Sequence, residues 1–211
     1  MTEEIQQEIY QAFGKMKERD FVGAEKILQE GLKKLPPQSN STQEALYFST
    51  LGVLHKLKGE PKEAWRCYEK AEKLLPDDPA LKLIMAKFLI DQFAQYDTAI
   101  KKAQQALKFA RGSPSFEHQA HATLALAHLK KGNKKEATRM LDLAMVDDFA
   151  QIITSQNINC DILEAFLARN LEREKCQHYI EKALQLAITK KEQKQIEFFT
   201  KLLESLEVTI Q

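Results

Sequence analysis

Small residues recur along this chain at one fixed spacing, and this spacing restricts the folds that the chain can adopt. Gly52, Ala64 and Ala71 are separated by twelve and then seven residues. Three further sets repeat these intervals: Ala12, Ala24 and Gly31; Ala86, Ala99 and Ala106; Ala125, Ala137 and Ala144. The interval from Ala86 to Ala99 has one extra residue. Alanine favours helix wherever it occurs, but that preference alone does not produce one spacing four times. The pattern therefore predicts four helix–turn–helix units.

The clearest copy of the unit is segment 45–76, ALYFSTLGVLHKLKGEPKEAWRCYEKAEKLLP. Its apolar residues predict two amphipathic helices joined by a tight, glycine-containing turn. Gly52 is small where the helices must approach each other, and Phe48 and Tyr68 are large enough to fill the space between them. Pro76 closes the unit, because a proline cannot continue a helix interior.

Segment 45–76 resembles the tetratricopeptide repeat (TPR), a helix–turn–helix unit of about 34 residues with few fixed positions. The matching residues are Leu51-Gly52, Gly59, Ala64, Tyr68, Ala71 and Pro76. His55 takes the place of the family's usual tyrosine, and Phe48 that of its tryptophan. The resemblance implies an all-α fold, a right-handed superhelical solenoid of helix–turn–helix repeats in a single domain over 1–211. Repeats stack in this way because one helix pair cannot bury its own apolar face.

The predicted repeats are followed by a degenerate helix pair at about 157–188 and a last helix at 190–208. The four repeats cover about 5–38, 45–78, 79–113 and 118–151. The extra residue of the third repeat is expected in its turn, at 91–97. One face of the last helix is apolar through Ile196, Phe199, Leu203 and Leu206. This face predicts a C-terminal capping helix that covers the end of the array, and a dimerisation helix is the alternative.

The net charge of the chain gives no general argument for a nucleic acid or a membrane as partner, because 31 basic residues balance 30 acidic ones to +1. The N-terminal sequence lacks the basic and apolar regions of a secretory signal, and no apolar run approaches the length of a membrane span. Cys67, Cys160 and Cys176 are odd in number and irregularly spaced, which is typical of reduced thiols. We therefore expect a cytoplasmic protein.

Stacked TPR units place the first helix of each pair on a concave inner wall, and the resemblance implies that partner peptides or helices dock in this groove. Matched residue by residue, the inner wall comprises Ile9, Phe13, Met16, Leu46, Ser49, Val53, Lys56, Leu57, Leu83, Lys87, Ile90, Ala122, Leu126, Leu129 and Lys130. An apolar floor with a few lysines favours an amphipathic helix or apolar peptide with acidic flanks. The alternative for any one position is packing against neighbouring repeats. The lysine, asparagine and arginine clamp by which some family members bind chaperone tails is missing.

Other kinds of site find less support in the sequence. His118, His121 and His128 fall near one helical face, but no cysteine lies close to complete a zinc site, and His55 and His128 occupy the same place in two repeats, which favours packing. Segment 101–139 carries nine basic and two acidic residues, a patch that would attract an acidic protein surface or phosphate. A solvated outer face with lysine-rich turns is the alternative explanation, and no nucleic acid is expected. Neither a phosphate-binding glycine-rich loop nor an H-E-x-x-H pattern occurs. No catalysis, cofactor or metal is therefore expected.

These observations predict a non-enzymatic adaptor or scaffold that holds a segment of a partner protein in its groove. Two alternatives stay open. The first is a self-associating structural protein, a homodimer through its C-terminal helices. The second is a peptide-sensing regulator that changes its superhelical pitch on binding.

Overall fold

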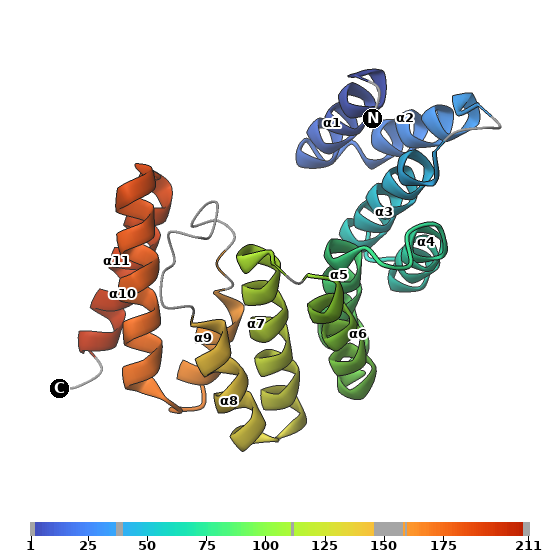
Figure 1. Cartoon of the computed structure of the whole chain (residues 1–211). Helices are drawn as coiled ribbons and strands as arrows, with labels where there is room; N and C mark the ends of the chain where they lie inside the picture. The colour runs from blue at the N-terminus through green and yellow to red at the C-terminus, as the bar shows by residue number, and fades with distance from the viewer. Residues whose placement is uncertain (1–2, 37–39, 111, 146–157, 159, 209–211) are drawn as a thin grey trace. The chain divides into compact units, whose positions relative to one another are not determined.

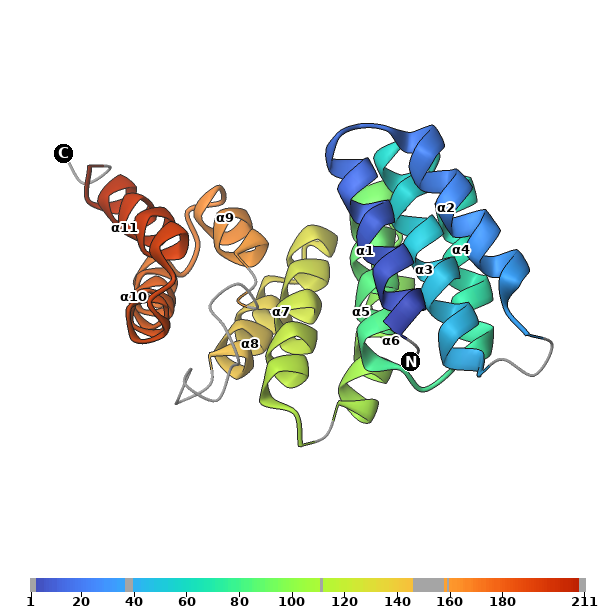
Figure 2. The same cartoon turned by 90° about the horizontal axis from the view of Figure 1, so that it is seen from above.

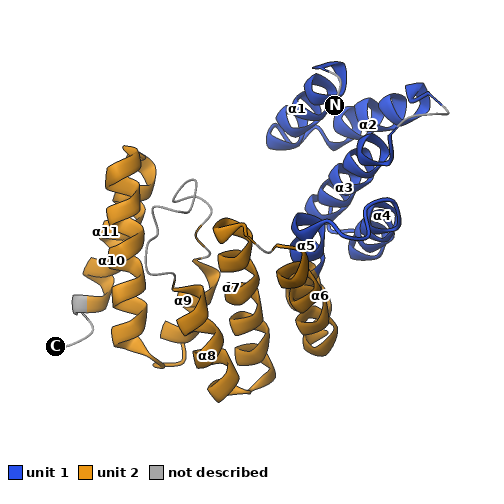
Figure 3. Cartoon of the chain, in the orientation of Figure 1, with its two compact units in different colours: residues 1–85 blue, residues 86–211 orange. Residues whose placement is uncertain are grey.

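Helix hairpins follow one another along the described part of the chain (Figures 1 and 2). The computed structural model describes residues 3–36, 40–110, 112–145, 158 and 160–208, and within them it has eleven α-helices, one π-helix and no strand. The predicted all-α repeat architecture is confirmed. The chain divides into two compact units, 1–85 and 86–211 (Figure 3). That the whole chain forms one domain stays a prediction.

Unit 1 contains two complete hairpins and the start of a third. α1 (Glu3–Lys17) packs against α2 (Phe21–Lys34), and α3 (Ser41–Leu57) packs against α4 (Pro61–Leu74). α2 also packs against α3, so the two hairpins share one core. The buried residues of this core are Ile5, Ile9, Ala12, Met16, Ala24, Leu28, Tyr47, Leu51 and Leu54. α5 (Pro79–Phe88) begins in unit 1 and ends in unit 2.

The predicted repeats turn at equivalent places, because one residue in each turn adopts a left-handed backbone conformation. The φ angle is 61° at Arg19, 75° at Gly59 and 91° at Gly132, and each of these residues follows the first small residue of its repeat by seven positions. The next backbone amide donates a hydrogen bond of 2.9 Å to the carbonyl five residues earlier, from Asp20 to Lys15, from Glu60 to His55 and from Asn133 to His128. This common turn confirms the repeat spacing predicted from the sequence.

The third repeat accommodates its extra residue in a π-helical turn. α5 continues into the π-helix η1 (Leu89–Phe93), and the left-handed residue is Ala94, with a φ angle of 51°, eight positions after Ala86 instead of seven. The amide of Gln95 donates over 3.1 Å to the carbonyl of Leu89, six residues earlier. Because a π turn holds one additional residue without ending the helix, the second helix of the repeat starts in the usual register.

Unit 2 is built around α7 (Pro114–Lys131). This helix packs against α6 (Tyr96–Phe109), α8 (Lys134–Ala144) and α9 (Asp161–Leu167). Nine residues of α7 are buried, including the polar side chains of His118 and Thr123. Because three helices pack against it, α7 is buried on most sides, whereas an ordinary surface helix buries only one face.

The last helices complete unit 2. α10 (Arg173–Lys190) packs against both α9 and α11 (Gln193–Val208). Two residues of the apolar face of α11, Phe199 and Leu206, are buried, and Ile196 and Leu203 are half-buried. The face predicted for the last helix therefore packs within unit 2, as a capping helix requires.

Two glycines lie where a helix backbone meets an aromatic ring. A Cβ atom at Gly52 would lie 2.4 Å from Cε1 of Tyr68, and one at Gly31 would lie 2.5 Å from Cε1 of Tyr47. Both rings are fully buried and cannot move aside freely. The predicted close approach at Gly52 is confirmed, because only a residue without a side chain lets the ring of α4 pack against the backbone of α3.

We expect Gly52→Ala to lower the free energy of unfolding by about 1–3 kcal/mol, because the added methyl group overpacks the contact with Tyr68. Urea unfolding followed by circular dichroism measures this change. The matched control is Gly14→Ala in α1, where a Cβ atom meets nothing within 4 Å. It should raise stability by about 0.5–1 kcal/mol through the better helix propensity of alanine. Equal effects of the two substitutions would contradict a packing role for Gly52.

Candidate protein-binding surface

The predicted groove residues of unit 1 fall into an accessible group and a buried pair. Ile9 and Met16 belong to the core between the hairpins. The accessible group consists of the exposed residues Phe13, Lys56 and Leu57 and the half-buried residues Leu46, Ser49, Val53 and Leu83, of which Leu46 and Val53 also pack against the core. Phe13 and Leu57 are apolar yet 38 % and 52 % exposed. Unit 1 therefore has accessible apolar side chains on α1, α3 and α5, at positions where the sequence predicts a binding groove.

The predicted groove residues of unit 2 are buried or paired with acidic residues. Four of them, Ile90, Ala122, Leu126 and Leu129, are at most 3 % exposed. Lys87 forms an ion pair with Asp161, and the ammonium nitrogen of Lys130 lies 3.9 Å from Oδ1 of Asp91. The burial on α7 arises because α9 packs against it in addition to α6 and α8. The binding role of these positions stays a prediction, and the structure places them in or beside the core of unit 2.

A pocket of about 310 Å³ opens beside α3 in unit 1, and we call it the apolar pocket. It lies between the N-terminal half of α3, the segment that precedes α5, and α5 itself. Its lining includes Ala45, Leu46, Ser49, Leu75, Leu81 and Ile84. Ile84 is 42 % exposed, so a large aliphatic side chain at the pocket is open to a partner.

Two polar side chains that line the apolar pocket, those of Ser49 and Asp78, are already hydrogen-bonded. The carbonyl of Leu46 accepts from the hydroxyls of Ser49 at 3.0 Å and Thr50 at 2.8 Å. The carboxylate of Asp78 accepts from the backbone amide of Leu81 at 2.6 Å, at the start of α5. A pocket with this lining favours an apolar side chain, because little unsatisfied polar surface has to lose its water.

The sequence indicates Leu46 and Ser49 at this pocket but not Leu75, Leu81 or Ile84. Leu81 and Ile84 are three residues apart on α5, a spacing that marks one face of a helix. The periodicity of the sequence is therefore enough to group these two residues. Leu75 follows α4 directly, where helical periodicity gives no information. The pocket exists because three segments meet, and only the tertiary structure shows this.

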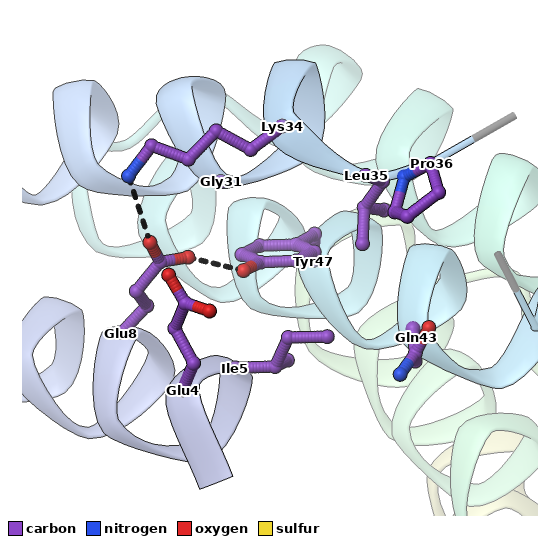
Figure 4. A pocket seen from close by; sticks show the side chains of 9 residues that line it. All are labelled: Glu4, Ile5, Glu8, Gly31, Lys34, Leu35, Pro36, Gln43 and Tyr47. Atoms are coloured by element: carbon purple, nitrogen blue, oxygen red, sulfur yellow. Dashed lines mark hydrogen bonds and ion pairs between the residues drawn. The ribbon is translucent and has the colours of Figure 1, made fainter. Parts of the chain in front are cut away.

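A second pocket of unit 1, of about 240 Å³, lies among the start of α1, the end of α2 and the start of α3, and we call it the Glu8 pocket (Figure 4). The carboxylate of Glu8 accepts a hydrogen bond from the hydroxyl of Tyr47 and pairs with the ammonium group of Lys34 at 3.2 Å. Burial, together with the charge and hydrogen bond of Glu8, raises the pKa of Tyr47 above its ordinary value. The phenol therefore stays protonated and continues to donate.

The histidines considered as metal ligands have different surroundings. His118 is fully buried, with Nδ1 2.8 Å from the carbonyl oxygen of Ala144 and Nε2 3.0 Å from the hydroxyl of Tyr179. Because a carbonyl only accepts, Nδ1 carries the proton and Nε2 accepts from Tyr179. The Nδ1 atoms of His121 and His128 are buried without a hydrogen-bond partner among the described residues. Within the same part of the chain, no group of three histidine, cysteine or acidic residues is arranged to hold a metal ion.

Acidic residues partly neutralise the basic segment 101–139. Lys131 pairs with Asp97 at 2.5 Å, and Arg139 pairs with Glu136 at 2.8 Å. Asp97 lies outside the segment, so a count along the sequence overstates the positive charge of this surface. The structure therefore weakens the argument for an acidic or phosphate-bearing partner at this place.

The cysteines do not have the surroundings of reactive thiols. All three are free. Burial raises the pKa of both Cys160 and Cys176 to about 11. A thiol with a raised pKa is rarely ionised at neutral pH and is a poor nucleophile.

Several solved structures share this arrangement of hairpins. PilW, a widely conserved type IV pilus biogenesis factor, matches with a TM-score of 0.63 and 12 % identity over 100 % of both chains. PilF of Pseudomonas aeruginosa matches with a TM-score of 0.62 and 16 % identity over 96 % of this chain and 91 % of that one. MamA matches with a TM-score of 0.55 and 20 % identity over 86 % of this chain and 96 % of that one. No family model and no curated protein matches the sequence.

This chain has the TPR-type repeat fold. The three similar structures are TPR-type repeat proteins, and the resemblance noted for segment 45–76 is thereby confirmed at the level of the fold. In the described part of this TPR-type chain, no helix combines the length and the apolar character that crossing a membrane requires.

In unit 2 of this TPR-type fold, His118 makes stability depend on pH. Burial is the main cause that lowers its pKa, while the hydrogen bond to Ala144 acts in the opposite direction and the nearby His121 lowers it further. In the unfolded chain the pKa of a histidine is about 6.5. As the pH falls below that value, the unfolded state takes up a proton before the folded state does. The free energy of unfolding then falls by up to about 1.4 kcal/mol per pH unit, until the lower folded pKa is reached.

We expect His118→Gln to reduce this acid-dependent loss of stability, because the neutral amide keeps a donor and an acceptor but does not titrate. Urea unfolding at about pH 7.5 and about pH 5.5 compares the variant with the wild type. His178→Gln is the matched control, since the side chain of His178 is largely exposed, and it should retain the pH dependence of the wild type. An unchanged pH dependence in His118→Gln would show that His118 does not cause it.

Proposed function

We propose that this chain is a non-enzymatic adaptor that binds an apolar or amphipathic segment of a partner protein at the apolar pocket of unit 1. The observation that carries this proposal is an accessible aliphatic pocket beside α3 in which the side chains of Ser49 and Asp78 are hydrogen-bonded within the chain. The TPR-type fold supports a role in protein interaction in general. The three free cysteines support a cytoplasmic location.

The surface beyond the apolar pocket supports a longer binding site. Phe13 on α1 and Leu57 on α3 are exposed apolar residues, and Val53 on α3 is a half-buried one. We propose that a bound segment continues along them. Each large apolar side chain that a partner buries contributes about 1.5–3 kcal/mol before the cost of ordering the segment. Lys56 is exposed on the same helix as Val53 and Leu57, and it would meet an acidic flank of the partner.

Ile84→Asp tests the proposal, because a carboxylate at the apolar pocket would lose its water when the partner binds. Affinity purification followed by mass spectrometry identifies the partner, and isothermal titration calorimetry with the purified partner then measures the dissociation constant. We expect at least a tenfold weakening, which is about 1.4 kcal/mol. Val22→Asp is the matched control, since Val22 is apolar and 81 % exposed on α2 but does not line the pocket. Wild-type affinity in Ile84→Asp, with helicity retained, would rule the pocket out as the binding site.

Self-association through the C-terminal helices is a second candidate function. The observation that favours it is that Phe198 of α11 and Ile188 of α10 remain exposed after α11 has packed against α10. Analytical ultracentrifugation of the wild type and of Phe198→Glu tests it. A dimer that Phe198→Glu dissociates would support this role, and a wild-type monomer at all concentrations used would exclude it.

A further inference from the structure

Among the described residues that line the Glu8 pocket, negative charge exceeds positive charge by one. Glu4 and Glu8 lie one turn apart on α1, and both line the pocket, together with Lys34 as the single basic residue of its lining. Like charges at this spacing repel each other. Lys34 pairs with Glu8, whereas Figure 4 draws no interaction between the carboxylate of Glu4 and the other residues that line the pocket. A ligand with one positive charge would balance the pocket.

Glu8 is held in place before any ligand arrives. Its side chain is only 17 % exposed, and the buried phenol of Tyr47 donates to one of its oxygens. The missing side chain of Gly31 makes this contact possible, because a Cβ atom there would lie 2.5 Å from Oε2 of Glu8. A carboxylate fixed in this way pays little entropy when it pairs with a cation.

The walls of the Glu8 pocket fit the stem of a long basic side chain. Ile5, Leu35 and Pro36 are apolar, and the ring of Tyr47 lies beside the two carboxylates (Figure 4). Arginine combines an aliphatic stem with a planar guanidinium group that pairs with carboxylates through two parallel hydrogen bonds. The pocket offers surfaces for all of these parts.

We propose that the Glu8 pocket receives an arginine side chain of a bound protein segment. The inference rests on the proposed function, in that the arginine belongs to the partner of the adaptor. Lys34 occupies the place of that arginine in the free protein. Its side chain is 63 % exposed and its pairing with Glu8 is of the weak surface kind, so the guanidinium displaces it at small cost. The two pockets of unit 1 then recognise different features of a partner, one apolar and one basic.

Nuclear magnetic resonance with a small probe tests the pocket without the partner. The full-length chain is titrated with Nα-acetyl-arginine methylamide, and the backbone amides of Gly31 and Tyr47 are followed. The control probe is Nα-acetyl-citrulline methylamide, which has the same shape as the arginine probe but no charge. We expect saturable shifts with the arginine probe that weaken as salt is added, and much smaller shifts with the citrulline probe. Equal binding of the two probes, or no saturable shift with arginine, would overturn the proposal.

Two pairs of variants locate the charges that matter. Glu4→Gln should weaken binding of the arginine probe by about two- to fivefold, whereas Glu3→Gln, which removes an exposed charge of the same helix turn outside the pocket, should not. Lys34→Met should strengthen binding, because it removes the internal competitor, whereas Lys33→Met should have no effect. Equal effects within either pair would contradict the proposal. The probe titration uses no partner protein. Its outcome therefore does not depend on whether Ile84→Asp weakens partner binding, and the two proposals can fail separately.

Discussion

Contact between a helix backbone and an aromatic ring is the constraint on which unit 1 depends. Gly52 leaves room for the ring of Tyr68 within one hairpin, and Gly31 leaves room for the ring of Tyr47 from the next hairpin. The first contact fixes the distance between paired helices, and the second fixes how neighbouring hairpins pack. The gap at Gly31 also lets Tyr47 reach Glu8. The same absence of a side chain therefore shapes the core and the Glu8 pocket.

The repeats share one backbone plan, with an added π turn in the third, but they differ in the chemistry that joins them. Four residues before the first small residue, the repeats carry Glu8, Phe48, Lys82 and His121 in turn. Phe48 lies beneath the ammonium group of Lys70, with 5.1 Å from the nitrogen to the ring centroid. Lys82 is buried and pairs at 2.9 Å with Glu72, an arrangement in which loss of either partner would leave a buried charge uncompensated. A position that resembles the tryptophan site of the TPR family thus has a different partner in each of the first three repeats, and in the fourth the Nδ1 atom of His121 has none among the described residues.

The candidate site was only partly predictable from the sequence. Leu46 and Ser49 were predicted for the groove because their positions match the inner wall of the TPR family, and both line the apolar pocket. The Glu8 pocket was not predicted, since Tyr47 and Glu8 are 39 residues apart and no periodic pattern relates them. Phe13 and Ile9 were predicted alike for the groove, yet Phe13 is accessible and Ile9 lies in the core. A helical pattern groups residues on a face but does not tell how far the neighbouring helix covers that face.

The sequence by itself determined the helices, their turns and the register of the repeats, because these depend on residues close together in the chain. The spacing from Ala86 to Ala99 even revealed the extra residue that became a π turn. The tertiary structure alone decided which apolar faces stay accessible. Ala122, Leu126 and Leu129 resemble groove residues in sequence, but α9 adds a third neighbour to α7 and they are buried. Burial depends on every element that packs against a side chain, and those elements come from distant parts of the chain.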